Sequence, residues 1–185
     1  MQPFACGAVP ASYIPGPITG AFPGDRINMK FTLIDRITEL KPGESITAVK
    51  SLSLAEEYLQ DHFPLFPLMP GVLMLEAMTQ ASAWLLRVSD NFRYSMTLLK
   101  EARNVKYAGF VEPGRTLVVT SSVFKDDGRQ VTFKAEGKLG DKTAVSGRLI
   151  LERFNLADDG LADANTDRVV VKEVKKLYAL LHPSA

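Results

Sequence analysis

Two side chains fourteen residues apart are the strongest candidates for proton-transfer chemistry. His62 lies directly before a stretch that contains three prolines, and Glu76 lies in the long apolar run that follows. An imidazole can accept and return a proton near neutral pH. A carboxyl group in apolar surroundings has a raised pKa and can then serve as a general acid. The pair therefore indicates general acid–base chemistry, and nothing in the sequence indicates a covalent nucleophile.

The run from residue 72 to residue 88 is expected to place Glu76 on a helix. Twelve of its seventeen residues are apolar, and Pro70 suits the first turn because a proline there loses no hydrogen bond. Glu76, Thr79 and Gln80 are spaced i, i+3 and i+4, so they form one polar spot in which Gln80 could support the carboxyl. The helix alone leaves a second interpretation open, in which Glu76 is a structural carboxyl bonded to a neighbouring backbone group.

The position of His62 favours the functional interpretation. A lone histidine in a loop is more often solvated or structurally bonded than catalytic. Here, however, prolines fix the path of the backbone from His62 to the start of the helix. The backbone N–H groups near Gly71 and Val72 form that start, which favours developing negative charge. A base, an anion-stabilising N–H group and an acid are therefore expected close together.

Strand-like patterns surround this helix. Ile46, Ala48, Leu52 and Leu54 share one face at a period of two residues, and Asp127-Gly128 is a strong hairpin signal. Further strands are indicated by residues 95–107, 116–124, 131–135 and 143–152. A helix that is apolar on nearly every side must also be covered on nearly every side. We therefore predict the α+β class and a hot-dog fold, a long antiparallel sheet wrapped around one central apolar helix.

Two tails flank the predicted domain. Residues 1–28 contain nine Gly and Pro residues and are expected to form an N-terminal extension. Residues 29–155 form the hot-dog domain, and residues 156–185 form a linker and an amphipathic helix, although Val169–Val171 would also suit a strand. We expect that helix to dock on its own body or on a dimer mate; a membrane-surface or partner helix is the alternative. Its apolar stripe consists of Val170, Val174, Leu177, Tyr178 and Leu181.

The composition excludes several classes of function. Lys and Arg number 22 and Asp and Glu 21, so the net charge of +1 gives no general attraction to nucleic acid or to a membrane surface. One cysteine and two histidines exclude an intrachain disulfide and make a metal cluster implausible. No apolar run approaches the roughly 20 residues that span a bilayer, and we expect no signal peptide. We expect a soluble, cytoplasmic protein without a cofactor.

The segments around the two candidate residues resemble a known family. Residues 62–64 (His-Phe-Pro), 67–73 (Pro-Leu-Met-Pro-Gly-Val-Leu) and 76–81 (Glu-Ala-Met-Thr-Gln-Ala) are similar to the signature of bacterial 3-hydroxyacyl-[acyl-carrier-protein] dehydratases of fatty acid synthesis. The resemblance covers roughly residues 29–154. It implies hot-dog dimers or trimers of dimers, without a metal or a redox cofactor. It also implies acyl carrier protein as the partner that carries the 3-hydroxyacyl chain.

The resemblance implies a role for each candidate residue. His62 of one subunit would remove the C2 proton, and Glu76 of the other would protonate the C3 hydroxyl, which leaves as water. The Gly71 amide would donate to the thioester oxygen, and the acyl chain would follow an apolar tunnel along the interface. A related branch, which also isomerises the double bond, has Asp in place of Glu76, so Glu favours plain dehydration. Arg103 and Lys106 lie where the family docks its carrier.

One departure from the family concerns the loop after His62. The family has Gly after His-Phe-Pro, whereas this chain has Leu65 followed by Phe66. We expect these apolar side chains to line the substrate tunnel at its mouth and to bias the acyl chain that the site accepts. The alternative is that they pack against Leu68 and Trp84.

Two other functions stay open. A hot-dog thioesterase would use a carboxylate to activate water or to attack the thioester, which leaves the position of His62 unexplained. A non-catalytic acyl-binding or assembly subunit would keep the fold without the chemistry. Incubation with a carrier-bound 3-hydroxyacyl thioester separates the three functions, because it would yield an enoyl product, a free thiol, or neither.

Overall fold

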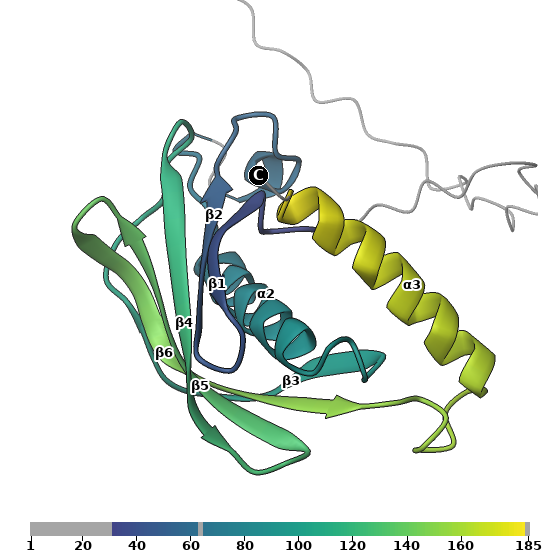
Figure 1. Cartoon of the computed structure of the whole chain (residues 1–185). Coiled ribbons are helices and arrows are strands. Elements are labelled where there is room, and N and C mark those ends of the chain that lie inside the picture. Colours follow the sequence, from purple (N-terminus) through teal and green to yellow (C-terminus); the bar gives the residue numbers. More distant parts are fainter. Residues whose placement is uncertain (1–30, 63–64, 184–185) are drawn as a thin grey trace, which may run out of the picture. The chain divides into compact units, whose positions relative to one another are not determined.

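The computed structural model describes residues 31–62 and 65–183, and the elements named below lie in these ranges. The predicted extension, residues 1–28, lies outside them. In chain order the elements are β1 (Arg36–Lys41), β2 (Ser45–Ser51), α1 (Tyr58–Asp61), α2 (Gly71–Ser89), β3 (Met96–Tyr107), β4 (Thr116–Asp126), β5 (Gln130–Leu139), β6 (Lys142–Phe154) and α3 (Ala164–Leu181) (Figure 1). None of these helices combines the length and apolarity needed to cross a bilayer.

The strands form one antiparallel sheet of six strands in the order β1-β2-β4-β5-β6-β3. The predicted hairpin joins β4 to β5, and Gly128 in its turn has a φ of 79°, which glycine adopts without strain. The sequence predicted four or five long strands, and β1 is the short addition. Its pattern shows no alternation, because only Ile37 in that strand is buried. The fold class is the predicted one.

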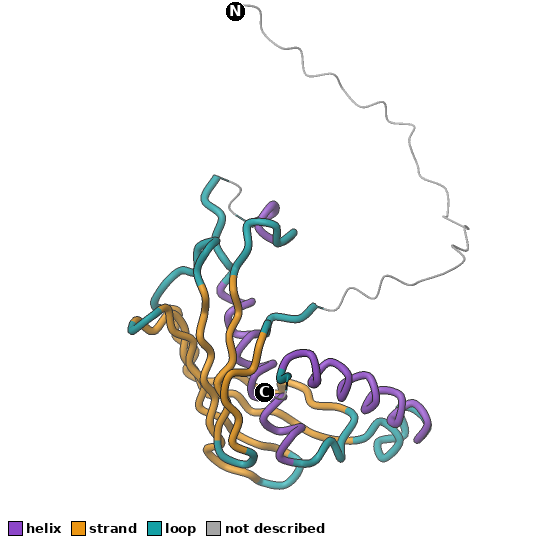
Figure 2. The backbone as a smooth tube through the Cα atoms, turned by 45° about the horizontal axis from the view of Figure 1, so that its top comes forward, coloured by secondary structure: helices purple, strands orange, loops and turns teal. Residues whose placement is uncertain are grey.

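Helix α2 packs against one face of this sheet (Figures 1 and 2). The residues that face the strands have no exposed surface, and they are Ala77, Met78, Ala81, Ser82 and Leu85. Burial of each large apolar side chain contributes about 1.5–3 kcal/mol, which makes this contact the main source of stability. The expectation that α2 is covered on nearly every side is wrong for the single chain. Val72 is 66% exposed, and Leu73, Leu75 and Glu76 are only partly buried.

Helix α3 packs on another side of α2 with the apolar stripe seen in the sequence. The ring of Tyr178 lies 6.1 Å from that of Trp84 and 5.5 Å from that of Phe92. The other stripe residues that pack against the core are Val174, Leu177 and Leu181. The helix starts at the Asp163 N-cap, whose carboxylate accepts the Thr166 N–H at 2.7 Å. Trp84 is 4% exposed as a result of its packing.

One carboxylate connects the first turn of α3 to the sheet. Asp167 accepts hydrogen bonds from the Ser95 hydroxyl and from the backbone N–H groups of Leu156 (2.9 Å) and Ala157 (3.0 Å). All three donors favour the charged carboxylate. The Ser95 bond, supported by the two backbone bonds, therefore lowers the pKa of Asp167 below its ordinary value.

We expect Asp167→Asn to loosen α3 and to remove an acid-sensitive part of the stability. The pKa of Asp167 is lower in the folded protein than the value of about 3.9 in an unfolded chain. Its contribution is therefore present above that value and is lost as the pH falls through the folded-state pKa. Emission of Trp84, the single tryptophan, should shift to longer wavelength when α3 detaches. The variant should show this shift at a lower urea concentration than wild type at pH 7.

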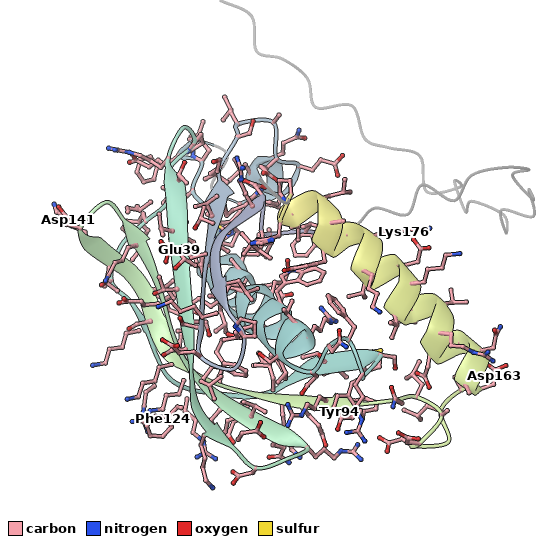
Figure 3. The ribbon with its side chains drawn as sticks, in the orientation of Figure 1. Glu39, Tyr94, Phe124, Asp141, Asp163 and Lys176 are labelled. Carbon is pink, nitrogen blue, oxygen red and sulfur yellow. The ribbon has the colours of Figure 1, made fainter. Side chains whose placement is uncertain are left out.

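Asp141→Asn is the matched control, since Asp141 is exposed at the turn between β5 and β6 (Figure 3). It should behave as wild type. The proposed anchor is wrong if Asp167→Asn and Asp141→Asn lose the buried tryptophan emission at the same urea concentration and at the same acid pH.

Candidate active site

His62 lies at the end of the short helix α1, where it is the C-cap residue. Its backbone has φ −119° and ψ 104°, and its side chain is partly buried. Extended backbone at this position turns the chain out of α1 and towards the loop that leads to α2. Phe63 and Pro64, the next two residues of the motif, lie outside the described ranges.

A buried ion-pair cluster holds the segment that leads into α1. The Lys50 ammonium group donates to Glu56 at 2.7 Å and to Asp35 at 3.3 Å, and Asp35 also accepts the Ser51 N–H at 2.6 Å. Burial lowers the pKa of Lys50, but the bond to Glu56 and the charge of Asp35 outweigh it, so the pKa is raised. The Tyr58 hydroxyl is buried without a partner among the described residues, and burial raises its pKa. Lys50 thus ties β2 to the segment that carries His62.

The loop before α2 exposes two large apolar side chains. Leu65 is 101% exposed and Phe66 is 58% exposed. The alternative that they pack into the core is wrong, since Leu68 and Trp84 are buried without them. Exposed apolar groups of this size are typical of surfaces that meet a ligand or another chain.

Helix α2 begins with open backbone donors. Pro70 is its N-cap residue, and no side chain caps this end. The Leu73 N–H donates to the Pro70 carbonyl at 2.9 Å, whereas the N–H groups of Gly71 and Val72 meet no acceptor in the described part of the chain. A Cβ at Gly71 would lie 3.1 Å from the Tyr107 ring, so glycine fits here with the least displacement. Two N–H groups at a helix start can bind an oxygen that gains negative charge.

Glu76 lies on the next turn of α2 and is partly buried, with Gln80 as its neighbour. The Gln80 side chain donates to the Glu76 carboxylate at 3.0 Å, and its amide oxygen accepts the Leu33 N–H at 2.8 Å. The second bond orients the amide so that its NH₂ faces Glu76. Thr79 does not join them, because its hydroxyl donates to the Leu75 carbonyl at 3.0 Å and the residue is buried. The polar spot therefore consists of two residues, where the spacing predicted three.

The two basic residues on β3 do not form one patch. Arg103 is bidentate to Glu101, with N–O distances of 2.6 and 2.7 Å. The strand register places Arg103 opposite Arg148, and Arg148 opposite Lys134. Lys106 is exposed and pairs in register with Ser146, beyond a register shift. Sequence reasoning missed Arg148 and Lys134 because only the pairing of β5, β6 and β3 brings them beside Arg103.

Comparison with known proteins gives one family. A family model described as a FabA-like domain matches residues 27–148. A relative named 3-hydroxyacyl-[acyl-carrier-protein] dehydratase FabZ, from Levilactobacillus brevis, is 37% identical over 116 residues, which are 63% of this chain and 78% of that protein. FabZ of Clostridium kluyveri is 33% identical over 120 residues, 65% of this chain and 83% of that protein.

A solved structure supports the fold. The dehydratase heterocomplex ApeI:P from Xenorhabdus doucetiae contains a chain that matches with a TM-score of 0.56 at 19% identity. The match covers 67% of this chain and 84% of that chain. At this identity the likeness concerns the fold alone, and it agrees with the hot-dog arrangement of α2 and the sheet.

We expect Lys50→Met to destabilise the protein by about 1–3 kcal/mol, since removal of one partner leaves two carboxylates without their cation. Urea unfolding at pH 7 measures the change. Lys125→Met is the matched control, because Lys125 pairs with Asp127 at 2.7 Å but both side chains are more than half exposed. The control should lose no more than about 0.5 kcal/mol. Equal losses in the two variants would show that the Lys50 cluster does not hold the α1 segment.

Proposed function

The chain belongs to the FabA-like family, and we propose that it is a 3-hydroxyacyl-[acyl-carrier-protein] dehydratase of fatty acid biosynthesis. The observation that carries this proposal is the 37% identity to FabZ over 78% of that relative's length. The reaction removes water from a carrier-bound 3-hydroxyacyl thioester and leaves the trans-2-enoyl thioester. We place it in the cytoplasm, in keeping with the single cysteine.

Three groups around the start of α2 divide the chemistry. His62 accepts the C2 proton, whose acidity rises as negative charge moves to the thioester oxygen. That oxygen accepts a hydrogen bond from the Gly71 N–H, which has no acceptor in the described part of the chain. Glu76 donates a proton to the C3 hydroxyl as the C3–O bond breaks, and water leaves. The C2–H electron pair becomes the new double bond, and proton transfer between His62 and Glu76 restores the starting state.

Gln80 acts as a positioning residue in this scheme. Its amide oxygen is held by the Leu33 N–H, so its NH₂ group is directed at the Glu76 carboxyl. A donor in that place restricts the rotation of the carboxyl group and leaves its second oxygen to face the substrate. A carboxylate in place of the Gln80 amide would instead repel Glu76.

We propose that each site combines His62 of one subunit with Glu76 of its partner in a homodimer. Two features of the single chain support this assembly. The partly buried face of α2 around Val72 and Glu76 leaves apolar surface uncovered. The twelve-residue strand β3 is also an open sheet edge with Leu98 48% exposed, and such edges usually pair with another strand. A twofold axis would cover both features at once.

Leu65 and Phe66 are proposed to line the mouth of the acyl tunnel. Their exposure, 101% and 58%, leaves both side chains available to a neighbouring subunit or to the acyl chain. Apolar groups beside His62 reduce the space near the thioester, so they would bias the site towards certain chain lengths or branching patterns.

We propose that the carrier docks on the row formed by Arg103, Arg148 and Lys134. Like charges directly opposite one another cost stability, which favours a role for the row in binding. Phe124 is 50% exposed beside it, with the Lys134 nitrogen 4.4 Å and the Arg148 guanidinium 4.9 Å from its ring centroid. Phe124 extends from the side of the sheet away from α2 (Figure 3). An acidic carrier protein complements this combination of positive charge and one aromatic ring.

The proposed roles of His62 and Glu76 are tested by His62→Ala and Glu76→Gln. Each change removes a proton-transfer group, so the rate of enoyl formation should fall by about 10²–10⁴-fold. Turnover of a carrier-bound 3-hydroxyacyl thioester, followed at the enoyl product, measures the fall, and circular dichroism reports the fold. His182→Ala, at the only other histidine, and Glu112→Gln should keep wild-type rates. Release of a free thiol without enoyl product would contradict the dehydratase.

Mixed dimers of His62→Ala and Glu76→Gln subunits test the shared site. If each site draws on both subunits, one site of the mixed dimer combines an intact His62 with an intact Glu76. Co-refolding should therefore restore up to half of the wild-type activity per mixed dimer. Absence of recovery, with mixing confirmed by mass, would place both groups in the same subunit.

Charge reversal tests the docking row. Arg148→Glu and Lys134→Glu should each raise KM for the carrier-bound substrate by about 10-fold at low salt, and added salt should reduce the difference. The rate with a short thioester that lacks the carrier should not change. Lys142→Glu, an exposed lysine at the opposite end of the hairpin, is the matched control. If the three variants show the same KM, the carrier docks elsewhere.

A further inference from the structure

One buried cation of the chain differs from the others in its surroundings. Lys50 and Arg153 have side chains only 6% and 10% exposed, and each contacts two carboxylates. The Nε atom of Arg87 is also buried, but it has no hydrogen-bond partner. Across residues 31–62 and 65–183, Arg87 has no carboxylate within ion-pair distance. A cation withdrawn from water is costly unless an anion or a set of hydrogen bonds compensates.

The nearest groups do not supply that compensation. The Arg87 guanidinium lies 5.3 Å from the centroid of the Trp84 ring, a contact much weaker than an ion pair with a carboxylate. Asp90, one turn further along, is bonded instead to Arg153, with both oxygens at 2.9 Å. Burial lowers the pKa of Arg87, but an arginine side chain stays charged at neutral pH. The surroundings therefore leave a positive charge without a counter-charge.

Helix geometry relates Arg87 to the candidate site. Eleven residues separate Glu76 from Arg87, which is close to three turns, so both side chains lie on the same face of α2 about 16 Å apart along the axis. Gln80 and Ala83 lie between them on this face. The face is opposite to the one that meets the sheet, where Ser82 and Leu85 have no exposed surface. Glu76 and Arg87 thus mark two ends of one line along the helix.

We propose that Arg87 binds a carboxylate at the far end of the acyl chain whose thioester end lies at Glu76. This inference rests on the proposed dehydratase function and specifies its substrate class, a 3-hydroxyacyl thioester with an acidic ω-terminus. The guanidinium offers a planar pair of N–H donors that matches a carboxylate in two parallel hydrogen bonds. Because the site around Arg87 contains little water, such a pair is stronger than on the surface. Binding at the far end would also set the length of chain that reaches Glu76.

The test compares two substrates that differ only at the ω-terminus. Carrier-bound 3-hydroxyacyl thioesters of several matched lengths are prepared with a methyl or a carboxylate end. Wild type should show kcat/KM at least 10-fold higher for the carboxylate form at one length. Arg87→Met keeps much of the side-chain volume without the charge, so it should remove this preference and leave kcat for the methyl form within 2-fold. Arg93→Met, at an exposed arginine of the following turn, should keep the preference.

A second measurement separates failure of this inference from failure of the proposed function. A saturated ω-carboxyacyl thioester has no hydroxyl to eliminate, so it reports binding alone. It should raise the Tm of wild type and of Arg93→Met, but not that of Arg87→Met. If wild type dehydrates neither substrate yet shows this shift, the proposed function fails and the Arg87 site stands.

Two outcomes overturn the inference. One is an equal ratio of carboxylate to methyl activity in wild type and Arg87→Met at every chain length. The other is a ligand-free Arg87→Met protein with a clearly lower Tm or a lost dimer, which would show that a carboxylate of a second copy neutralises Arg87. The inference itself expects the ligand-free variant to be at least as stable as wild type, because it no longer buries an unpaired charge.

Discussion

The packing of α2 against one face of the six-stranded sheet is the contact on which the rest of the molecule depends. It buries one complete side of the helix, including Met78 and Leu85, and so fixes the rotation of the helix about its axis. Once that rotation is set, the opposite side must carry the polar residues Glu76, Gln80 and Arg87. The apolar contact thus determines where the chemistry of the helix is presented, although none of the apolar residues takes part in it.

Polar groups near this contact are stabilised by specific partners. Gln80 is held by the Leu33 backbone and in turn donates to Glu76. Lys50 joins β2 to the segment before α1 through two carboxylates. Such support holds functional side chains in place before a substrate arrives. The remaining open groups, the first N–H groups of α2 and the guanidinium of Arg87, are those for which we propose substrate partners.

Helix α3 adds a second layer to one side of α2. It lies after the segment that matches the FabA-like family, residues 27–148, so it is an addition to the shared fold. Tyr178 shields Trp84, and Asp167 secures the first turn through Ser95 and two backbone N–H groups. Its position leaves the N-terminal half of α2 uncovered, which is the half that bears Glu76.

Local patterns in the sequence determined the central helix, its start at Pro70 and the β4–β5 turn, because helix periodicity, proline geometry and glycine at positive φ act within a few residues. They also identified His62 and Glu76 as candidates. Only the tertiary structure decided which neighbours these groups have. It gave Gln80 rather than Thr79 to Glu76, and it exposed Leu65. The physical reason is that strand register, helix rotation and the partner of a buried charge depend on contacts between residues far apart in the chain.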